Sequence, residues 1–209
     1  METTKTLQNY LDELSSNSPT PGGGNVSALC GSLAASLGIM VCNLTIGKKK
    51  YSDVEMEMIS LKEKLELFQK KFIYLANEDN LAFDKVMDAF KLPKESDEEK
   101  EKRNQEIEQA TIGAAEVPSK VMQTAKELLS LLRVIMEKGN KNSISDAGVA
   151  IALIETASKG AYLNVLINCA SLNNQIIAQE IKKRADILFN ETINECNTLL
   201  QNIILSFNK

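Results

Sequence analysis

Apolar residues recur at steps of three and four along most of the chain, which is the period of a helix that packs on one face. This spacing predicts one long helix over residues 53–90, with alternating steps that suit antiparallel helix packing. Its apolar stripe consists of Met58, Leu61, Leu65, Phe68, Phe72, Leu75, Ala82, Phe83, Val86 and Phe90. Alternation with a period of two, the pattern of a strand, does not appear.

Turn-forming and capping residues divide the rest of the chain into further helices. Ser96 and Glu99 form a capping-box pattern that starts a helix after a charged segment, and Pro118 indicates a helix boundary or a first turn. Together the patterns predict an all-α single domain over residues 1–209, a bundle of six to seven helices with long antiparallel core helices. The other predicted helices cover residues 4–14, 25–46, 120–136, 144–172 and 174–207.

The amino-acid composition excludes several kinds of functional site. The formal net charge of −4 disfavours nucleic-acid binding. Histidine is absent, which excludes a histidine acid–base pair and the commonest zinc-ligand set. The four cysteines have no CxxC spacing, so they indicate small apolar side chains in a reducing compartment rather than disulfides or a reactive thiol. The charged start of the chain is not a signal peptide pattern, so we expect a cytoplasmic protein.

A stretch without charged residues, 15–47, is long enough to span a membrane. It contains several glycines and polar residues, however, and is only weakly apolar for a membrane span. Its helical part has small residues at helical spacing, which allow another helix backbone to approach closely. We therefore expect a buried core helix and no association with a membrane. The small residues are Ala28, Gly31, Ser32 and Ala35.

Three constellations have the composition of a ligand site. The first is the glycine run Gly22–Gly24, which directly precedes the uncharged helix. Backbone N–H groups at a helix start favour negative charge, so a carboxylate, a phosphate or a developing oxyanion fits there. A tight turn into a buried helix explains the same glycines without a ligand.

The second constellation is a single residue, Asp79, which lies on the apolar face of the long predicted helix. A carboxylate that faces a core must find partners or take up a proton. A raised pKa would suit a general acid near neutral pH. The alternative is a rotated helix that leaves Asp79 at the surface or in a structural polar contact.

The third constellation is a helix face on which Asp146, Asn164 and Asn168 alternate with small residues. Asparagine offers both donors and acceptors, which suits an amide-rich heterocycle. Asp146 also lies where an acid caps a helix, and capping alone explains it equally well. The lysines Lys48–Lys50 either attract an anionic group or complement the end of the preceding helix.

Taken in this order, these segments resemble the cyclodeaminase/cyclohydrolase family of folate one-carbon enzymes. The resemblance implies an all-helical subunit that forms a homodimer and binds a tetrahydrofolate derivative as substrate. It also implies that no metal or tightly bound cofactor takes part, and that the chemistry occurs at the carbon between N5 and N10. The matching segments are TPGGGNVSAL, LTIGKKKY, LANEDNLAF with AFKLPK, GNKNSISDAGVAIAL and GAYLNVLIN.

The resemblance also implies roles for particular residues. Asp79 aligns with the presumed proton donor of the family, while Asn77 stands where the family often has a second acid. This difference weakens any mechanism with two carboxylates. Asp146 would hold the cationic amidine or a pterin nitrogen. The expected substrate contacts are Pro21, Gly22, Gly23, Gly24, Asn25, Lys48, Ser145, Asn164 and Asn168.

Three functions follow from the resemblance. The first is formimidoyltetrahydrofolate cyclodeaminase, which converts 5-formimino-tetrahydrofolate to 5,10-methenyl-tetrahydrofolate and ammonia. The alternative is 5,10-methenyl-tetrahydrofolate cyclohydrolase, which forms 10-formyl-tetrahydrofolate. The second alternative is a folate-binding or scaffold helical dimer without catalysis. The residues by themselves do not decide between the two enzymatic activities.

Overall fold

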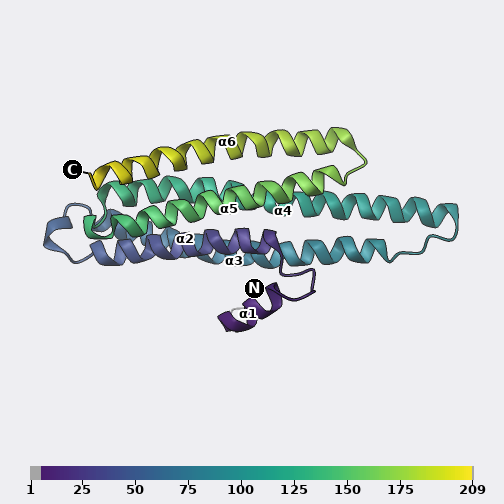
Figure 1. Ribbon diagram of the computed structural model, residues 1–209, viewed down its shortest axis with the longest axis horizontal. Helices are drawn as coiled ribbons and strands as arrows, with labels where there is room; N and C mark the ends of the chain where they lie inside the picture. Colours follow the sequence, from purple (N-terminus) through teal and green to yellow (C-terminus); the bar gives the residue numbers. More distant parts are fainter. Residues whose placement is uncertain (1–5, 209) are drawn as a thin grey trace.

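The computed structural model describes residues 6–208, and within them it confirms the predicted all-α bundle (Figure 1). Six α-helices and two short 3₁₀ turns follow one another, and no strand occurs in these residues. The helices are α1 Leu7–Leu14, α2 Gly23–Thr45, α3 Glu55–Phe90, α4 Asp97–Lys138, α5 Ile144–Ala170 and α6 Gln175–Ser206, with the 3₁₀ turns η1 Lys49–Tyr51 and η2 Lys141–Ser143. The predicted start of the first helix, Thr4, lies outside the described residues.

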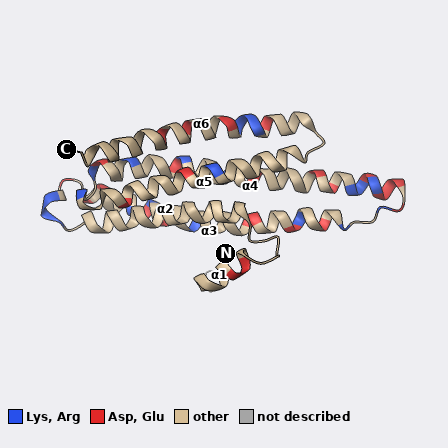
Figure 2. Ribbon diagram, viewed as in Figure 1, with Lys and Arg blue, Asp and Glu red and all other residues tan. Residues whose placement is uncertain are grey.

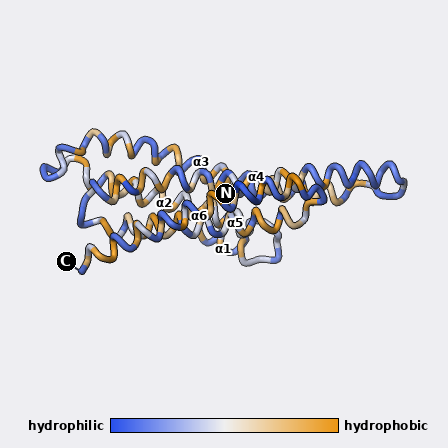
Figure 3. Tube along the Cα trace, turned by 90° about the horizontal axis from the view of Figure 1, so that it is seen from above, coloured by the Kyte–Doolittle hydropathy of each residue, from blue (hydrophilic) through white to orange (hydrophobic). Residues whose placement is uncertain are grey.

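Helices α2, α3, α4 and α5 pack side by side as a long bundle, and α6 covers α4 and α5. The paired ends of α3 and α4 extend beyond the other helices in Figure 1. This tip is rich in charged residues in Figure 2 and hydrophilic in Figure 3. The predicted capping box of Ser96 and Glu99 is confirmed at the start of α4. Helix α1 lies on the outside of the bundle and contacts the start of α2 through its buried Tyr10.

The glycines of α2 allow its backbone to approach α3 very closely. A Cβ atom added at Gly24 would lie 2.1 Å from Oδ1 of Asp79, and one at Gly31 would lie 2.3 Å from the ring of Phe72. Both distances are too short for any side chain larger than hydrogen. Ala28, which lies between these glycines, and Ala35, one turn after Gly31, are fully buried. The small-residue stripe of the sequence therefore forms the contact between these two helices.

Two segments, α2 and Lys141–Ala170, are long and apolar enough to cross a membrane by length and composition alone. In the structure 61% of the apolar window of α2 is buried inside the bundle. Its buried residues pack against α3 and α5, as expected for a core helix.

The predicted break at Pro118 is wrong, because α4 continues through this residue without interruption. Proline has no N–H group and cannot bond the carbonyl four residues earlier, which is that of Ala114. Here the side-chain amide of Asn168, from α5, donates a hydrogen bond to the Ala114 carbonyl at 2.9 Å. Helix α5 thus supplies the hydrogen-bond donor that α4 lacks at Pro118. The helix predicted over residues 120–136 is the second half of α4.

Because Asn168 replaces the hydrogen bond that Pro118 cannot make, we expect the stability effects of mutating these two residues to be coupled. Replacing Asn168 with alanine should lower the free energy of unfolding by about 1–3 kcal/mol, because it leaves the Ala114 carbonyl unpaired. In a Pro118→Ala background the same replacement should lower it less, since the new N–H group can bond Ala114. Urea unfolding of the four proteins at one protein concentration measures the coupling. Equal losses in both backgrounds would show that Pro118 and Asn168 are independent.

Candidate functional site

A cleft of about 330 Å³ opens where the start of α2 meets the last third of α3 and the second half of α5. Its volume lies at the lower end of the usual range for small-molecule sites, roughly 300–1,000 Å³. Among the described lining residues, Asp79 has the one ionisable side chain. The cleft is lined by Pro19, Thr20, Gly22, Gly23, Gly24, Asp79, Phe83, Val86, Ala114, Asn164, Ile167 and Asn168.

Asp79 caps helix α2 from across the bundle. The N-cap residue Gly22 provides no side-chain hydrogen bond, and the carboxylate of Asp79 accepts one from the backbone N–H of Asn25. Burial raises the pKa of Asp79, and the hydrogen bond from Asn25 opposes part of that rise. The site therefore holds a carboxyl group that exchanges a proton closer to neutral pH than an exposed aspartate does.

The helix start was predicted to present its N–H groups to an anionic ligand. The structure places the chain's own carboxylate there instead, on the N–H of Asn25. Gly22, Gly23 and Gly24 do line the cleft, and the missing side chain of Gly24 makes room for Asp79. The first role of Gly24 is therefore to let the acid reach the helix start.

The side chain of Asn25 is a structural clamp rather than a cleft contact. It is fully buried, and its amide donates to the carbonyl of Ala76 at 2.8 Å and to Oδ1 of Asn80 at 3.2 Å. Its oxygen accepts a hydrogen bond from the hydroxyl of Tyr10 at 3.0 Å. These bonds tie α2 and α1 to the turn of α3 that carries Asp79. The Asn25 side chain therefore lies outside the residues that line the cleft, and a substrate contact of Asn25 stays a prediction.

Asn164 and Asn168 lie on the wall of the cleft, as their shared helix face predicted. Both hydrogens of the Asn168 amide are used, by the carbonyls of Ala114 and Asn164, each at 2.9 Å. The amide of Asn164 donates to the carbonyl of Gly160 at 2.8 Å. With both amide hydrogens used, the Asn168 side chain can only accept a hydrogen bond from a ligand, whereas one hydrogen bond is donated by the Asn164 amide and its second hydrogen is left for a ligand.

Sequence reasoning missed the apolar wall of the cleft. Phe83 and Val86 belong to the stripe of α3 and were interpreted as plain core, and Ile167 was not singled out, yet all three line the cleft. Ile167 is 64% exposed, which is high for an isoleucine on a bundle helix. The position of Asp79 could have identified Phe83 and Val86 as lining residues, because residues one and two turns further along the same helix face lie next to it.

Three predicted site residues lie away from this cleft. Asp146 and Ser145 stand in the first turn of α5, about 27 Å along the helix from Asn164 at 1.5 Å per residue. Lys48 follows the far end of α2 and is exposed. Because α2 and α5 are long rods, motifs at their two ends cannot meet within one subunit. Asp146, Ser145 and Lys48 therefore do not line the cleft of Asp79 within one subunit, and their roles in the site stay predictions. Pro21 is buried in the loop and lies outside the lining residues.

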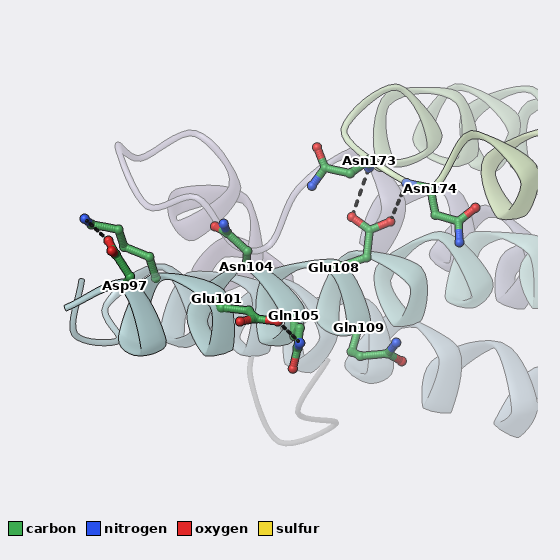
Figure 4. Close-up of a pocket in the computed structure, with 9 residues that line it drawn as sticks. Asp97, Glu101, Asn104, Gln105, Glu108, Gln109, Asn173 and Asn174 are labelled. Atoms are coloured by element: carbon green, nitrogen blue, oxygen red, sulfur yellow. Dashed lines mark hydrogen bonds and ion pairs between the residues drawn. The ribbon is translucent and has the colours of Figure 1, made fainter. Parts of the chain in front are cut away.

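A larger groove of about 570 Å³ lies along the start of α4 and the connection between α5 and α6 (Figure 4). Its acid Glu108 accepts hydrogen bonds from the backbone N–H groups of Asn173 and Asn174, at 2.9 Å and 2.8 Å. Glu108 therefore holds the helix connection in place. The other residues drawn in Figure 4 are mostly exposed and polar, including an ion pair between Asp97 and Lys100. Burial raises the pKa of Glu108, but the hydrogen bonds from Asn173 and Asn174 together lower it further, so that its net pKa shift is opposite to that of Asp79 in the smaller cleft.

The fold and the cleft define the class of the protein: an all-α bundle whose small-molecule cleft contains one desolvated carboxyl group. The family model described as formiminotransferase-cyclodeaminase matches residues 6–187. The chain belongs to this family, which the sequence motifs had suggested.

Individual relatives agree with this assignment. The chain is 41% identical over 187 residues to a methenyltetrahydrofolate cyclohydrolase of Methylorubrum extorquens, covering 90% of each protein. It is 30% identical over 185 residues to the formimidoyltransferase-cyclodeaminase of Rattus norvegicus, which is 88% of this chain and 34% of that protein. The crystal structure of a formiminotetrahydrofolate cyclodeaminase from Thermotoga maritima superposes with a TM-score of 0.81 at 32% identity, covering 96% and 98% of the two chains.

The close approach at Gly24 gives a direct test of the site geometry. Gly24→Ala should displace the Asp79 carboxylate, because the added Cβ would lie 2.1 Å from its Oδ1. We expect a stability loss of about 1–3 kcal/mol, the usual range for overpacking. The matched control is Gly113→Ala, at an exposed position of α4 where an added Cβ meets nothing within 4 Å. That control should stabilise the protein by about 0.5–1 kcal/mol. Similar effects at both positions would contradict the geometry.

The buried hydroxyl of Tyr10 should matter for stability. Tyr10→Phe leaves the Asn25 oxygen without this donor, and we expect a loss of about 1–3 kcal/mol in the free energy of unfolding. Tyr74→Phe is the control, because the Tyr74 side chain is 59% exposed and its change should stay within about 0.5 kcal/mol. Chemical unfolding of both variants measures the difference. Equal losses in the two variants would show that the hydrogen bond between Tyr10 and Asn25 does not contribute to stability.

Proposed function

We propose that this protein is an enzyme that hydrolyses 5,10-methenyl-tetrahydrofolate to 10-formyl-tetrahydrofolate. One observation of the site carries the catalytic assignment: Asp79 is a desolvated carboxyl group inside a cleft of ligand size. The choice of the hydrolase over the deaminase rests on the 41% identity to a cyclohydrolase that has nearly the same length. It revises the sequence-based preference for cyclodeaminase.

A single carboxyl group suffices for the hydrolysis. Water adds to the cationic carbon between N5 and N10, and Asp79 takes one proton from that water as a general base. The resulting tetrahedral carbon bears a hydroxyl group and both nitrogens. Asp79 then returns its proton to N5 as the bond between N5 and the carbon breaks. The hydroxyl proton leaves to solvent and the formyl carbonyl forms, so one water is consumed and one proton is released.

The surroundings of Asp79 fit both steps. Its raised pKa makes it a stronger base than an exposed aspartate toward water, and the protonated form is still a competent acid toward N5. The apolar side chains of Phe83, Val86 and Ile167 provide a surface for a flat ring system. The oxygens of Asn164 and Asn168 can accept hydrogen bonds from the N–H groups of a pterin.

Cyclodeamination of 5-formimino-tetrahydrofolate is the second candidate. It is favoured by the TM-score of 0.81 and full-length match to the Thermotoga maritima cyclodeaminase. The same carboxyl group would serve there, since N10 attacks the formimino carbon and ammonia leaves with a proton. A scaffold without catalysis is the least supported alternative, because packing alone does not require a desolvated acid at a cleft.

We also propose that the enzyme is a soluble cytoplasmic homodimer that needs no metal or tightly bound cofactor. Within residues 6–208, no group of three His, Cys, Asp or Glu side chains is placed to hold a metal ion. The chemistry above requires only proton transfer, so we expect turnover to be unchanged by a metal chelator.

An ultraviolet assay of the purified protein decides between the candidates. With 5,10-methenyl-tetrahydrofolate, the methenyl absorbance should disappear faster than in the control without enzyme. With 5-formimino-tetrahydrofolate, a cyclodeaminase would instead generate that absorbance and release ammonia. Acceleration of the second reaction alone would overturn our choice, and no acceleration of either would favour the scaffold.

Asp79→Asn should lower kcat/KM by about 100- to 10,000-fold, the usual contribution of a general acid–base group. In the wild type, kcat/KM should rise with pH through a pKa above the ordinary aspartate value of 3.8. Asp84→Asn is the control, since Asp84 is an exposed aspartate on the same helix, and it should keep full activity. Retention of activity by Asp79→Asn would refute the proton-transfer role.

The raised pKa also predicts a trade-off with stability. The folded protein binds the Asp79 proton more tightly than the unfolded chain, so wild-type stability falls as pH rises from 3.8 to the folded-state pKa and stays lower above it. Asparagine does not titrate. Asp79→Asn should therefore raise Tm relative to the wild type near pH 7, and the gain should shrink toward pH 4. A Tm difference that does not change with pH would contradict the desolvation of Asp79.

A further inference from the structure

A line of side chains on α3 leads from the cleft to the charged tip of the bundle. Asp79, Phe83 and Val86 line the cleft, and Phe90 is the last residue of α3. Successive steps of four, three and four residues place all four side chains on one face of the helix. The Phe90 side chain is 49% exposed. The apolar wall of the cleft therefore continues along α3 to its end, and these four residues are called the α3 track below.

Helix α4 runs beside α3 in the opposite direction (Figure 1) and reaches the end of the α3 track with Arg103. Arg103 lies eleven residues before Ala114, which lines the cleft, and so shares its face of α4. Its Nη2 and Nε donate hydrogen bonds to the Phe90 carbonyl at 3.1 Å and 3.3 Å. Its guanidinium carbon lies 5.5 Å from the centroid of the Phe90 ring. Arg103 is therefore fixed about 16 Å along α3 from Asp79, at 1.5 Å per residue.

The positive charge of Arg103 has no acidic partner. Within residues 6–208 its guanidinium donates hydrogen bonds to the Phe90 carbonyl and forms no ion pair, whereas Lys91 at the same tip is paired with Asp88. Arginine has five N–H donors. The two that cap the end of α3 lie on one edge of the guanidinium, so each Nη group keeps a donor on the other edge. That free edge has the geometry that binds a carboxylate.

The cleft has no positive charge for the anionic end of its proposed substrate. None of the described residues that line it is Lys or Arg. Resting on the proposed function, the substrate carries a p-aminobenzoyl group on N10 and ends in a glutamate. From the reacting carbon to the glutamate carboxylates it spans roughly 10–13 Å with standard bond lengths. With a hydrogen bond of about 3 Å at each end, the substrate bridges the distance from Asp79 to Arg103.

We propose that Arg103 binds a glutamate carboxylate of the substrate, and that the p-aminobenzoyl ring lies along the apolar part of the α3 track. Phe83 and Val86 offer an apolar surface to this ring. The ring and carbonyl of Phe90 hold the guanidinium in one orientation, so less side-chain entropy is lost when a carboxylate binds. The contact lies far from the reacting atoms and is the same in the ground state and the transition state. It therefore lowers KM without raising kcat.

Removing the glutamate from the substrate tests this contact. Arg103→Ala should raise KM for 5,10-methenyl-tetrahydrofolate about tenfold with little change in kcat, the effect of losing one charge-assisted hydrogen bond. For 5,10-methenyl-tetrahydropteroate, which lacks the glutamate, the wild type and the variant should have the same KM. Lys102→Ala is the matched control, because Lys102 is an exposed cation next in sequence that lines a separate groove. It should keep the wild-type KM for both substrates.

Two results would overturn the proposal. If Arg103→Ala kept the wild-type KM for the complete substrate, Arg103 would only cap α3. If KM rose equally for both substrates, Arg103 would act by holding the end of α3 in place and not by binding the glutamate. Should the alanine variant fail to fold, Arg103→Gln replaces it with the same expected KM pattern, since glutamine can donate to the Phe90 carbonyl and has no charge.

Binding without turnover separates this proposal from the proposed function. A wild type that accelerates neither reaction would refute the proposed function. Calorimetry with 5-formyl-tetrahydrofolate and 5-formyl-tetrahydropteroate then decides the role of Arg103. The wild type should bind the first about tenfold more tightly, and Arg103→Ala should bind both alike. A wild type without this preference, or a variant that keeps it, would overturn the role of Arg103 whether or not the protein is an enzyme.

Discussion

The close approach of α2 to α3 is the constraint on which the rest of the molecule depends. Glycine at positions 24 and 31 brings the two backbones so near that a Cβ atom at either position would overlap α3. This contact places the start of α2 against the side of Asp79, where the N–H of Asn25 meets the carboxylate. The fold thereby buries an ionisable group and supplies it with one donor, which keeps it reactive without leaving it unpaired.

Much of the fold could be predicted from the sequence because its helices are long and strongly periodic. The break at Pro118 could not, since the residue that replaces the lost helix partner, Asn168, comes from 50 positions later in the chain and contacts Ala114 only after folding. Asp79 was recognisable as a polar interruption of an apolar stripe. The structural role of the Asn25 side chain could not be predicted, because its bonds to Ala76 and Tyr10 depend on three helices meeting at one point.

The placement of Lys48, Ser145 and Asp146 has a different explanation. The order of motifs along the sequence does not give the distances between them in space. In a bundle of long helices, two motifs on one helix can lie at opposite ends of the bundle. The structure therefore separates these residues from the cleft within a subunit, and their roles in the site stay predictions.

The most direct test of the account is the pKa of the Asp79 carboxyl group, measured by NMR on protein labelled with ¹³C-aspartate. The signal is assigned by its absence in Asp79→Asn. The account predicts titration above the ordinary value of 3.8, because burial outweighs the hydrogen bond from Asn25. A carboxyl group that titrates at or below 3.8 would contradict it, since Asp79 would then be a fully ionised structural cap and a poor proton carrier near neutral pH.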